Sequence, residues 1–81
     1  MELFDISKLK IDDKPVVVII DGIKGLCSIG YFNTWSLRIK IEFLNKHPVL
    51  GKIFMTKYFN MKNPGYLEWG YKNNIMTIYK M

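Results

Sequence analysis

The sequence has no alanine or glutamine, and only one cysteine and one histidine among its 81 residues. Alanine and glutamine are strong helix formers, so their absence argues against a helical bundle. The single Cys27 excludes an internal disulfide, which is typical of a protein kept in a reducing compartment. Because its neighbours are mostly apolar, we expect Cys27 to be a small core residue and not a reactive thiol.

Motifs for catalysis, metal binding and phosphate binding are also lacking. Cys27 and His47 are the only nucleophile–base pair that the sequence offers, and nothing in their spacing brings them together. One cysteine and one histidine cannot supply the three or four ligands of a zinc site, and solvated turns explain Asp12, Asp13 and Asp21 more simply than an oxygen-ligand cluster does. The glycine spacing matches neither a P-loop nor a dinucleotide-binding loop. We therefore predict no enzyme activity, no metal and no cofactor.

Long hydrophobic runs are absent as well. The longest uncharged stretch, residues 25–37, is too short and too polar to cross a bilayer, and Glu2 and Asp5 do not fit a secretory signal peptide. These features predict a cytoplasmic protein without membrane contact. Eleven of the twelve basic residues are lysine, and Asn and Ile are frequent. This usage is typical of a low-GC bacterium or one of its viruses, whose protein would act in the bacterial host cytoplasm.

The clearest pattern that is present is a strict alternation from Trp35 to Phe43. Its large apolar residues fall on one side, and Ser36, Arg38, Lys40 and Glu42 fall on the other. A period of two is typical of a half-buried β-strand. The segment therefore predicts a strand that buries its apolar side and points Arg38 and Lys40 to water.

Further strands are predicted on both sides of this segment. The run Val16–Ile20 has the composition of a strand covered on both faces. It is followed by Asp21-Gly22, a strong signal for a tight hairpin turn, and by a return strand over Ile23–Ile29. Residues 30–34 are predicted to form a turn, and residues 45–48 are predicted to break the strand pattern. After a loop at residues 60–65, Tyr66–Lys72 and Ile75–Lys80 flank a predicted Asn73-Asn74 turn.

Two segments are ambiguous. Residues 3–11 fit both a helical stripe and a strand, and we favour a helical turn that leads into a strand. Residues 48–59 are either a helix beginning at Pro48 or a strand, and we favour the strand because Gly51 would weaken a helix by about 1 kcal/mol.

Together these features predict one domain, residues 1–81, with a mainly β or α+β fold. Five or six short antiparallel strands would form a small barrel or rolled sheet, which protects its edges. A short N-terminal helical turn, an Asp-Gly turn and a strongly bent sheet would give it a topology similar to Sm-like or SH3-like barrels.

Charge is distributed unevenly along the chain. Residues 1–21 carry five acids and three lysines, a net charge of −2, whereas residues 22–81 carry nine basic and two acidic residues, a net charge of +7. A basic body favours polyanions or acidic protein surfaces, although it also serves solubility alone. The twelve aromatic residues are more than so small a core encloses completely, so we expect some rings at the surface.

The candidate binding surface combines basic residues with these rings. Arg38 and Lys40 lie on the polar face of the alternating strand, and Tyr66 lies on the face of its strand opposite Leu67. Rings that stack on bases, beside cations that hold phosphates, are typical of single-strand binders. The predicted anion-binding residues are Arg38, Lys40, Lys57, Tyr58, Lys62, Tyr66 and Lys72.

We therefore predict a non-enzymatic binding module for single-stranded nucleic acid or a nucleotide. The alternative is a phage or mobile-element inhibitor that covers an acidic surface of a host defence enzyme. A third hypothesis is a homo-oligomer whose edge strands pair between subunits and leave a pocket for a small anion.

Overall fold

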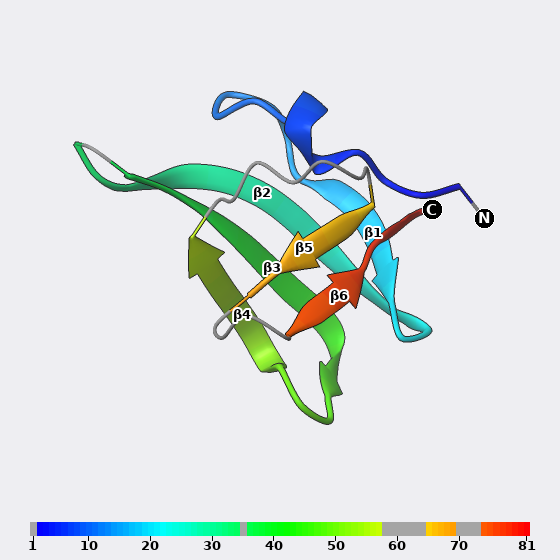
Figure 1. Ribbon diagram of the computed structural model, residues 1–81. Helices are drawn as coiled ribbons and strands as arrows, with labels where there is room; N and C mark the ends of the chain where they lie inside the picture. The colour runs from blue at the N-terminus through cyan, green and yellow to red at the C-terminus, as the bar shows by residue number, and fades with distance from the viewer. Residues whose placement is uncertain (1, 35, 58–64, 70–73) are drawn as a thin grey trace.

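A computed structural model describes residues 2–34, 36–57, 65–69 and 74–81, and these residues form strands and one short helical turn (Figure 1). All strand pairs within these ranges are antiparallel, so the prediction of a mainly β fold is confirmed. The elements in chain order are the 3-10 turn η1 (Ile6–Lys8) and the strands β1 (Val16–Ile20), β2 (Ile23–Asn33), β3 (Ser36–His47), β4 (Gly51–Lys57), β5 (Tyr66–Glu68), β6 (Ile75–Thr77) and β7 (Tyr79–Lys80).

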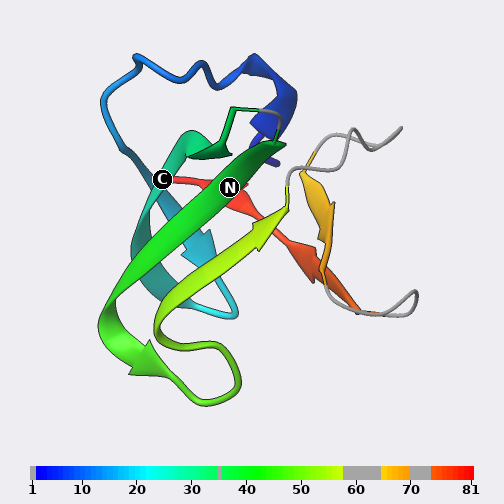
Figure 2. The ribbon, with the colours of Figure 1, turned by 90° about the vertical axis from the view of Figure 1, so that its left-hand side faces the viewer.

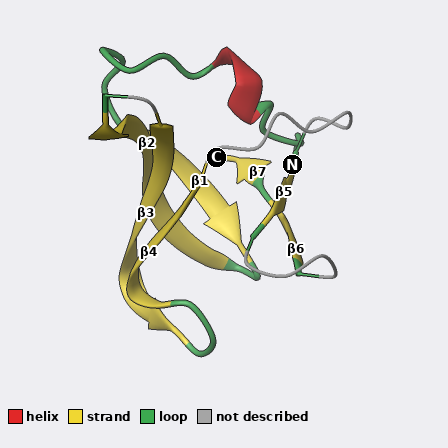
Figure 3. Cartoon of the chain, turned by 60° about the vertical axis from the view of Figure 1, so that its left-hand side comes forward, coloured by secondary structure: helices red, strands yellow, loops and turns green. Residues whose placement is uncertain are grey.

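The strands form two sheets. The larger one has the order β4-β3-β2-β1-β7, and β5 pairs with β6 in a separate two-stranded sheet. Figure 3 shows the β5–β6 hairpin facing one side of the larger sheet. Leu67 of β5 and Met76 of β6 are buried there in the same hydrophobic core as Ile39 and Ile41 of β3. We call the covered side of the larger sheet its inner face and the opposite side its outer face.

The described strands do not form a closed barrel, so of the two predicted architectures, a small barrel or a rolled sheet, the closed barrel is not found. Ile78, the one residue between β6 and β7, is fully buried. Its N–H donates to the carbonyl oxygen of Gly65 at 2.7 Å, and its own carbonyl accepts from Phe4 at 2.9 Å. The chain thus leaves the small sheet at Ile78 and joins β1 of the large one, while β4 and β7 form its two edges in the described part of the chain.

The alternation of β3 has the predicted sidedness. Ile39, Ile41 and Phe43 are buried in the core, whereas Lys40 and Glu42 are exposed on the outer face. Trp35, the first residue of the predicted pattern, lies outside the described residues. The polar outer face of β3 is therefore confirmed.

The β1–β2 hairpin is also confirmed, with both turn residues at positive φ, 51° for Asp21 and 79° for Gly22. Ile20 pairs directly with Ile23 across this two-residue turn, the geometry that Asp-Gly favours. The expectation that β1 is covered on both faces is wrong. Val18 is fully buried, but Val17 faces solvent on the outer face, because no element among the described residues packs over it.

Two predicted breaks are continuous strand in the structure (Figure 2). The strand β2 runs on to Asn33 through the predicted turn at residues 30–34, with an irregularity after Tyr31. The side-chain oxygen of Asn33 closes the connection by accepting from both the N–H and the hydroxyl of Ser36. The strand β3 runs on to His47, and its register with β4 shifts between Glu42 and His47.

The two ambiguous segments are also resolved in their described parts. Residues 51–57 are a strand, and Gly51 begins it with a φ of 81°, so the helical alternative is wrong there. Residues 58 and 59 lie outside the described residues. At the N-terminus a helical turn forms at Ile6–Lys8, and the Asp5 side chain caps it by accepting from Ser7. No strand forms over residues 7–11, so the alternating pattern there was misleading.

The C-terminal hairpin is shorter than predicted. Its strands β5 and β6 have three residues each, and the N–H of Trp69 donates to the carbonyl of Asn74 at 2.8 Å beyond them. The Trp69 ring packs edge-on against Phe54 of β4, with ring centroids 5.4 Å apart. The predicted turn residue Asn73 lies outside the described residues.

Candidate anion-binding surface

Three of the predicted anion-binding residues lie together on the outer face. Arg38 pairs across the ladder with Lys57 of β4, and Lys40 stands two residues further along β3. Opposite residues in a sheet have Cβ atoms about 5 Å apart, and residues two apart on one strand are about 7 Å apart. Arg38, Lys40 and Lys57 therefore form one cationic group, which we call the basic triad.

A shallow depression lies beside the basic triad, next to Gly30. Gly30 pairs with Arg38 on β2, and a Cβ atom placed on it would have no neighbour within 4 Å. The missing side chain leaves a cavity of about 210 Å³ on this part of the sheet. Its described lining residues are Ser28, Ile29, Gly30, Tyr31, Arg38, Lys40 and Met55.

The electrostatics of the basic triad favour an anion. Like charges directly opposite one another destabilise a sheet, and Arg38 and Lys57 occupy such a pair of positions. In the described part of the chain, the side chains of Lys40 and Lys57 form no ion pair or hydrogen bond. A phosphate or carboxylate bound between these cations would relieve their mutual repulsion.

The predicted rings are not brought to this surface. Tyr66 is 37% exposed, but it belongs to β5, where its neighbour Leu67 points into the core. Tyr66 therefore faces away from the larger sheet, on the side of the molecule opposite the basic triad. Three further predicted site residues, Tyr58, Lys62 and Lys72, lie outside the described residues.

Sequence reasoning missed two residues that border the depression, Gly30 and Tyr31. Tyr31 is 67% exposed, but it pairs with Leu37, so its side chain leaves β2 on the side opposite Arg38. The sequence predicts a turn at both residues, and a turn gives no indication of which side chains share a face. The signal that could have found them is the continued pairing of β2 with β3, which sets Gly30 opposite Arg38.

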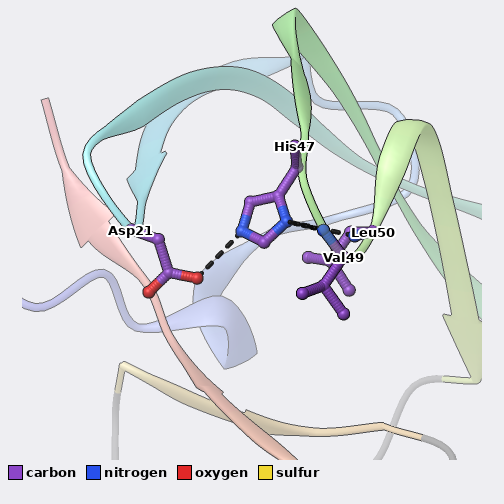
Figure 4. Close-up of polar contacts among 4 residues, drawn as sticks. All are labelled: Asp21, His47, Val49 and Leu50. Atoms are coloured by element: carbon purple, nitrogen blue, oxygen red, sulfur yellow. Dashed lines mark hydrogen bonds and ion pairs between the residues drawn. The ribbon is translucent and has the colours of Figure 1, made fainter.

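The Cys27/His47 pair is not arranged for nucleophilic catalysis. Cys27 is fully buried, and this burial raises the pKa of its thiol to about 12. The Nδ1 atom of His47 accepts from the backbone N–H groups of Val49 and Leu50, both at 3.0 Å, and Nε2 lies 2.8 Å from Oδ2 of Asp21 (Figure 4). Because Nδ1 accepts two hydrogen bonds, its lone pair is occupied and the ring proton is on Nε2. The histidine thus ties the β1–β2 turn to the β3–β4 turn.

The Asp13 carboxylate also has a structural role. Oδ2 of Asp13 accepts from the N–H of Lys10 at 2.8 Å and closes a turn before β1.

Within the described ranges, no three His, Cys, Asp or Glu side chains come together as metal ligands would. The same residues contain no helix with the length and apolar character needed to cross a bilayer.

Comparisons of this chain with protein-family models, with curated proteins and with solved structures find no match.

Proposed function

We propose that this protein is a binding module that holds single-stranded nucleic acid or a nucleotide on the outer face of its sheet. The observation that carries this proposal is the juxtaposition of the basic triad and the depression beside Gly30, with the exposed residue Tyr31 at the end of the depression. Cations that hold phosphates and a ring that stacks on a base are the two elements of single-strand binding.

The size of the depression favours a chain that lies across the surface. Its volume of about 210 Å³ is below the roughly 300 to 1,000 Å³ of pockets that enclose a whole small molecule. It has room for a phosphate or part of a base, while the rest of the strand would extend over Lys40 and Lys57.

Fluorescence anisotropy of a labelled oligothymidine tests this proposal over a range of salt concentrations. Three phosphate contacts predict a slope of about −2 in a plot of log K against log salt for a single strand. Arg38→Gln and Lys40→Gln should each reduce the steepness of this slope by about 0.7. Gly30→Val should weaken binding with an unchanged slope, because it fills the depression and keeps the charges.

Lys8→Gln is the matched control, since it removes one exposed lysine from η1, outside the outer face. The proposal is refuted if Lys8→Gln and Arg38→Gln weaken binding equally, because a diffuse attraction to net charge would then be sufficient. Binding that does not depend on salt would refute it as well.

A second function is favoured by one specific observation, an apolar row on the same outer face. Val17, Leu26 and Ile53 occupy successive positions across the sheet, interrupted only by Glu42, and each is between 38% and 50% exposed. Apolar residues beside cations suit an acidic protein partner, as the inhibitor hypothesis requires. Ile53→Ser should then abolish capture of a protein from nuclease-treated bacterial lysate but leave oligonucleotide binding intact. The reverse result would favour nucleic acid.

For the fold, the proposal is a rolled sheet of Sm-like or SH3-like topology. It is supported by the short N-terminal helical turn, the curved strands β2 and β3, and the return of β7 to β1. Nuclear Overhauser contacts between the backbones of β4 and β5 would indicate closure. A complete set of assigned contacts without any between these strands would contradict it.

A further inference from the structure

A second cavity lies at the other end of the long strands, where the β1–β2 and β3–β4 turns approach the C-terminal hairpin. Its volume is about 250 Å³. The residue pair Ile20/Ile23 marks this end of β2, seven positions from Gly30, so the two cavities are separated by about 20 Å along the strand. The described lining residues of this second cavity are Asp21, His47, Val49, Leu50, Trp69, Ile75, Met76 and Thr77.

The carboxylate of Asp21 is held in a defined orientation at this cavity. The backbone of Asp21 is in the left-handed region, with a φ of 51°, and its Oδ2 atom accepts from Nε2 of His47 at 2.8 Å. The histidine is itself 3% exposed and is fixed by the amides of Val49 and Leu50 (Figure 4). A carboxylate held by a buried and hydrogen-bonded partner is oriented before any ligand arrives.

The second carboxylate oxygen remains available. The side chain of Asp21 is 74% exposed, and among the described residues its only hydrogen-bond partner is His47, through Oδ2. Oδ1 can therefore accept from a donor in the cavity. A cationic donor would form the stronger, charge-assisted bond.

The rest of the lining is apolar or uncharged. Leu50, Trp69 and Met76 are at least partly buried and form walls, and Val49 and Ile75 are exposed at the rim. Asp21 and His47 are the only titratable groups in the described lining, and the hydrogen bonds of His47 keep its ring in the neutral Nε2–H form. The described lining thus carries a negative formal charge, in a protein whose net charge is +5.

We infer that this cavity binds a small organic cation, a primary ammonium or guanidinium group on a short apolar stem. The cationic group would donate to Oδ1 of Asp21. The stem would pack against Leu50 and the ring of Trp69, whose face also attracts a cation. A free amine and the side chain of a lysine or arginine share this chemistry. The volume of about 250 Å³ leaves room for the cationic group and part of its stem.

The test is an NMR titration of the ¹⁵N-labelled protein with phenethylamine and, separately, with 2-phenylethanol. The two probes have nearly the same shape and differ in charge. We expect phenethylamine to shift the amide signals of Gly22, Val49 and Leu50 and the indole signal of Trp69, and to bind about tenfold more tightly than the alcohol, which corresponds to about 1.4 kcal/mol. Equal affinities, or no shifts at millimolar probe, would overturn the inference.

Asp21→Asn is the matched variant. Asparagine tolerates the left-handed backbone, and its carbonyl oxygen can still accept from Nε2 of His47, so the turn and the fold are kept. The variant should lose the preference for phenethylamine and retain whatever affinity it has for 2-phenylethanol. An unchanged preference would show that Asp21 is not the recognition group.

Two further arms complete the design. Val49→Lys places a rival cation at the exposed rim and should weaken phenethylamine binding, whereas Lys8→Gln, in η1 and outside the lining of this cavity, should leave it unchanged. N-acetyl-lysine amide and agmatine distinguish the sources. Tighter binding of the lysine derivative would indicate a protein side chain as the occupant, and tighter binding of agmatine a free guanidine. If neither competes with phenethylamine, the inference fails.

Discussion

The two ring nitrogen atoms of His47 have different hydrogen-bond partners. Two substitutions of this histidine should each remove the hydrogen bonds of one nitrogen and keep those of the other. In His47→Asn, the amide oxygen takes the place of Nδ1 and can still accept from Val49 and Leu50, but the bond to Asp21 is lost. In His47→Gln, the amide nitrogen can still reach Asp21, but the two backbone N–H groups lose their acceptor. Both variants lose the contact between the histidine ring and Phe43, whose ring centroids are 5.2 Å apart.

The magnitudes follow from this count of hydrogen bonds. Each bond contributes about 1 kcal/mol to the free energy of unfolding, and the ring contact contributes about 0.5 to 1 kcal/mol. His47→Asn should therefore cost about 2 kcal/mol and His47→Gln about 3 kcal/mol. A difference of 1 kcal/mol corresponds to about 4 to 8 °C in melting temperature for a domain of this size.

Urea and thermal unfolding of the two variants, monitored by circular dichroism, measure this difference. Asp21→Asn is the control, since it retains an acceptor for Nε2 and should cost less than either histidine variant. The tautomer is read independently from the ¹⁵N shifts of the His47 ring, which should show a protonated Nε2. If His47→Gln is the more stable of the two, or if Nδ1 carries the proton, the assignment of the buried histidine to the β3–β4 turn is refuted.

Three other predictions concern the core and the turns. Gly25→Ala should lower the free energy of unfolding by about 1 to 3 kcal/mol, because the new Cβ would lie 2.9 Å from the methyl of a buried isoleucine. Gly30→Ala has open space at the Cβ position and should instead raise it by about 0.5 to 1 kcal/mol; equal effects of the two substitutions in urea unfolding would contradict this. Gly65→Ala should cost about 2 to 3 kcal/mol, since Gly65 has a φ of 82° and its new Cβ would lie 2.6 Å from that of Leu3; an unchanged melting temperature would show that this contact gives way freely. Burial raises the pKa of the Cys27 thiol from 9.0 to about 12, so the unfolded chain loses this proton first and the free energy of unfolding should fall as the pH rises from about 9 to 12. By pH 10 the loss is about 1.4 kcal/mol, and urea titrations should show it in the unsubstituted protein and not in Cys27→Ala.

The sequence predicts those parts of the fold that depend on neighbouring residues, namely the sidedness of β3 and the β1–β2 turn. The alternation along β3 predicts which side chains are buried, because a strand has a period of two and one face meets the core. Asp21-Gly22 predicts a two-residue turn, because both positions must adopt positive φ. For the same reason Arg38 and Lys40 could be placed on the outer face from the sequence alone.

The features that the sequence did not predict depend on distant partners. The sequence predicts a turn beginning at Gly30, but pairing with Arg38 keeps Gly30 in a strand. The local sequence around Gly30 does not show this pairing. The run of β1 was expected to be covered on both faces, because an apolar composition does not say whether a second layer exists. Tyr66 was grouped with the lysines, although its location depends on which side of the large sheet the β5–β6 hairpin covers. That side is decided by the packing of Leu67 and Met76.

The two ends of the β2–β3 ribbon are constrained differently, and the difference fits the two sites that we propose. At the His47 end, the buried histidine joins two turns and orients the carboxylate of Asp21. This arrangement suits a small cation, because the affinity for a small ligand comes from a few groups that are already held in place. At the Gly30 end, the ladder is irregular after Tyr31, and the exposed Lys40 and Lys57 lie beside a half-buried Arg38. A polyanion requires less shape complementarity at this surface, because its binding free energy comes largely from the release of counterions from several phosphates. Sites about 20 Å apart with no shared partner should also be energetically independent, so each can be removed by substitution without loss of the other.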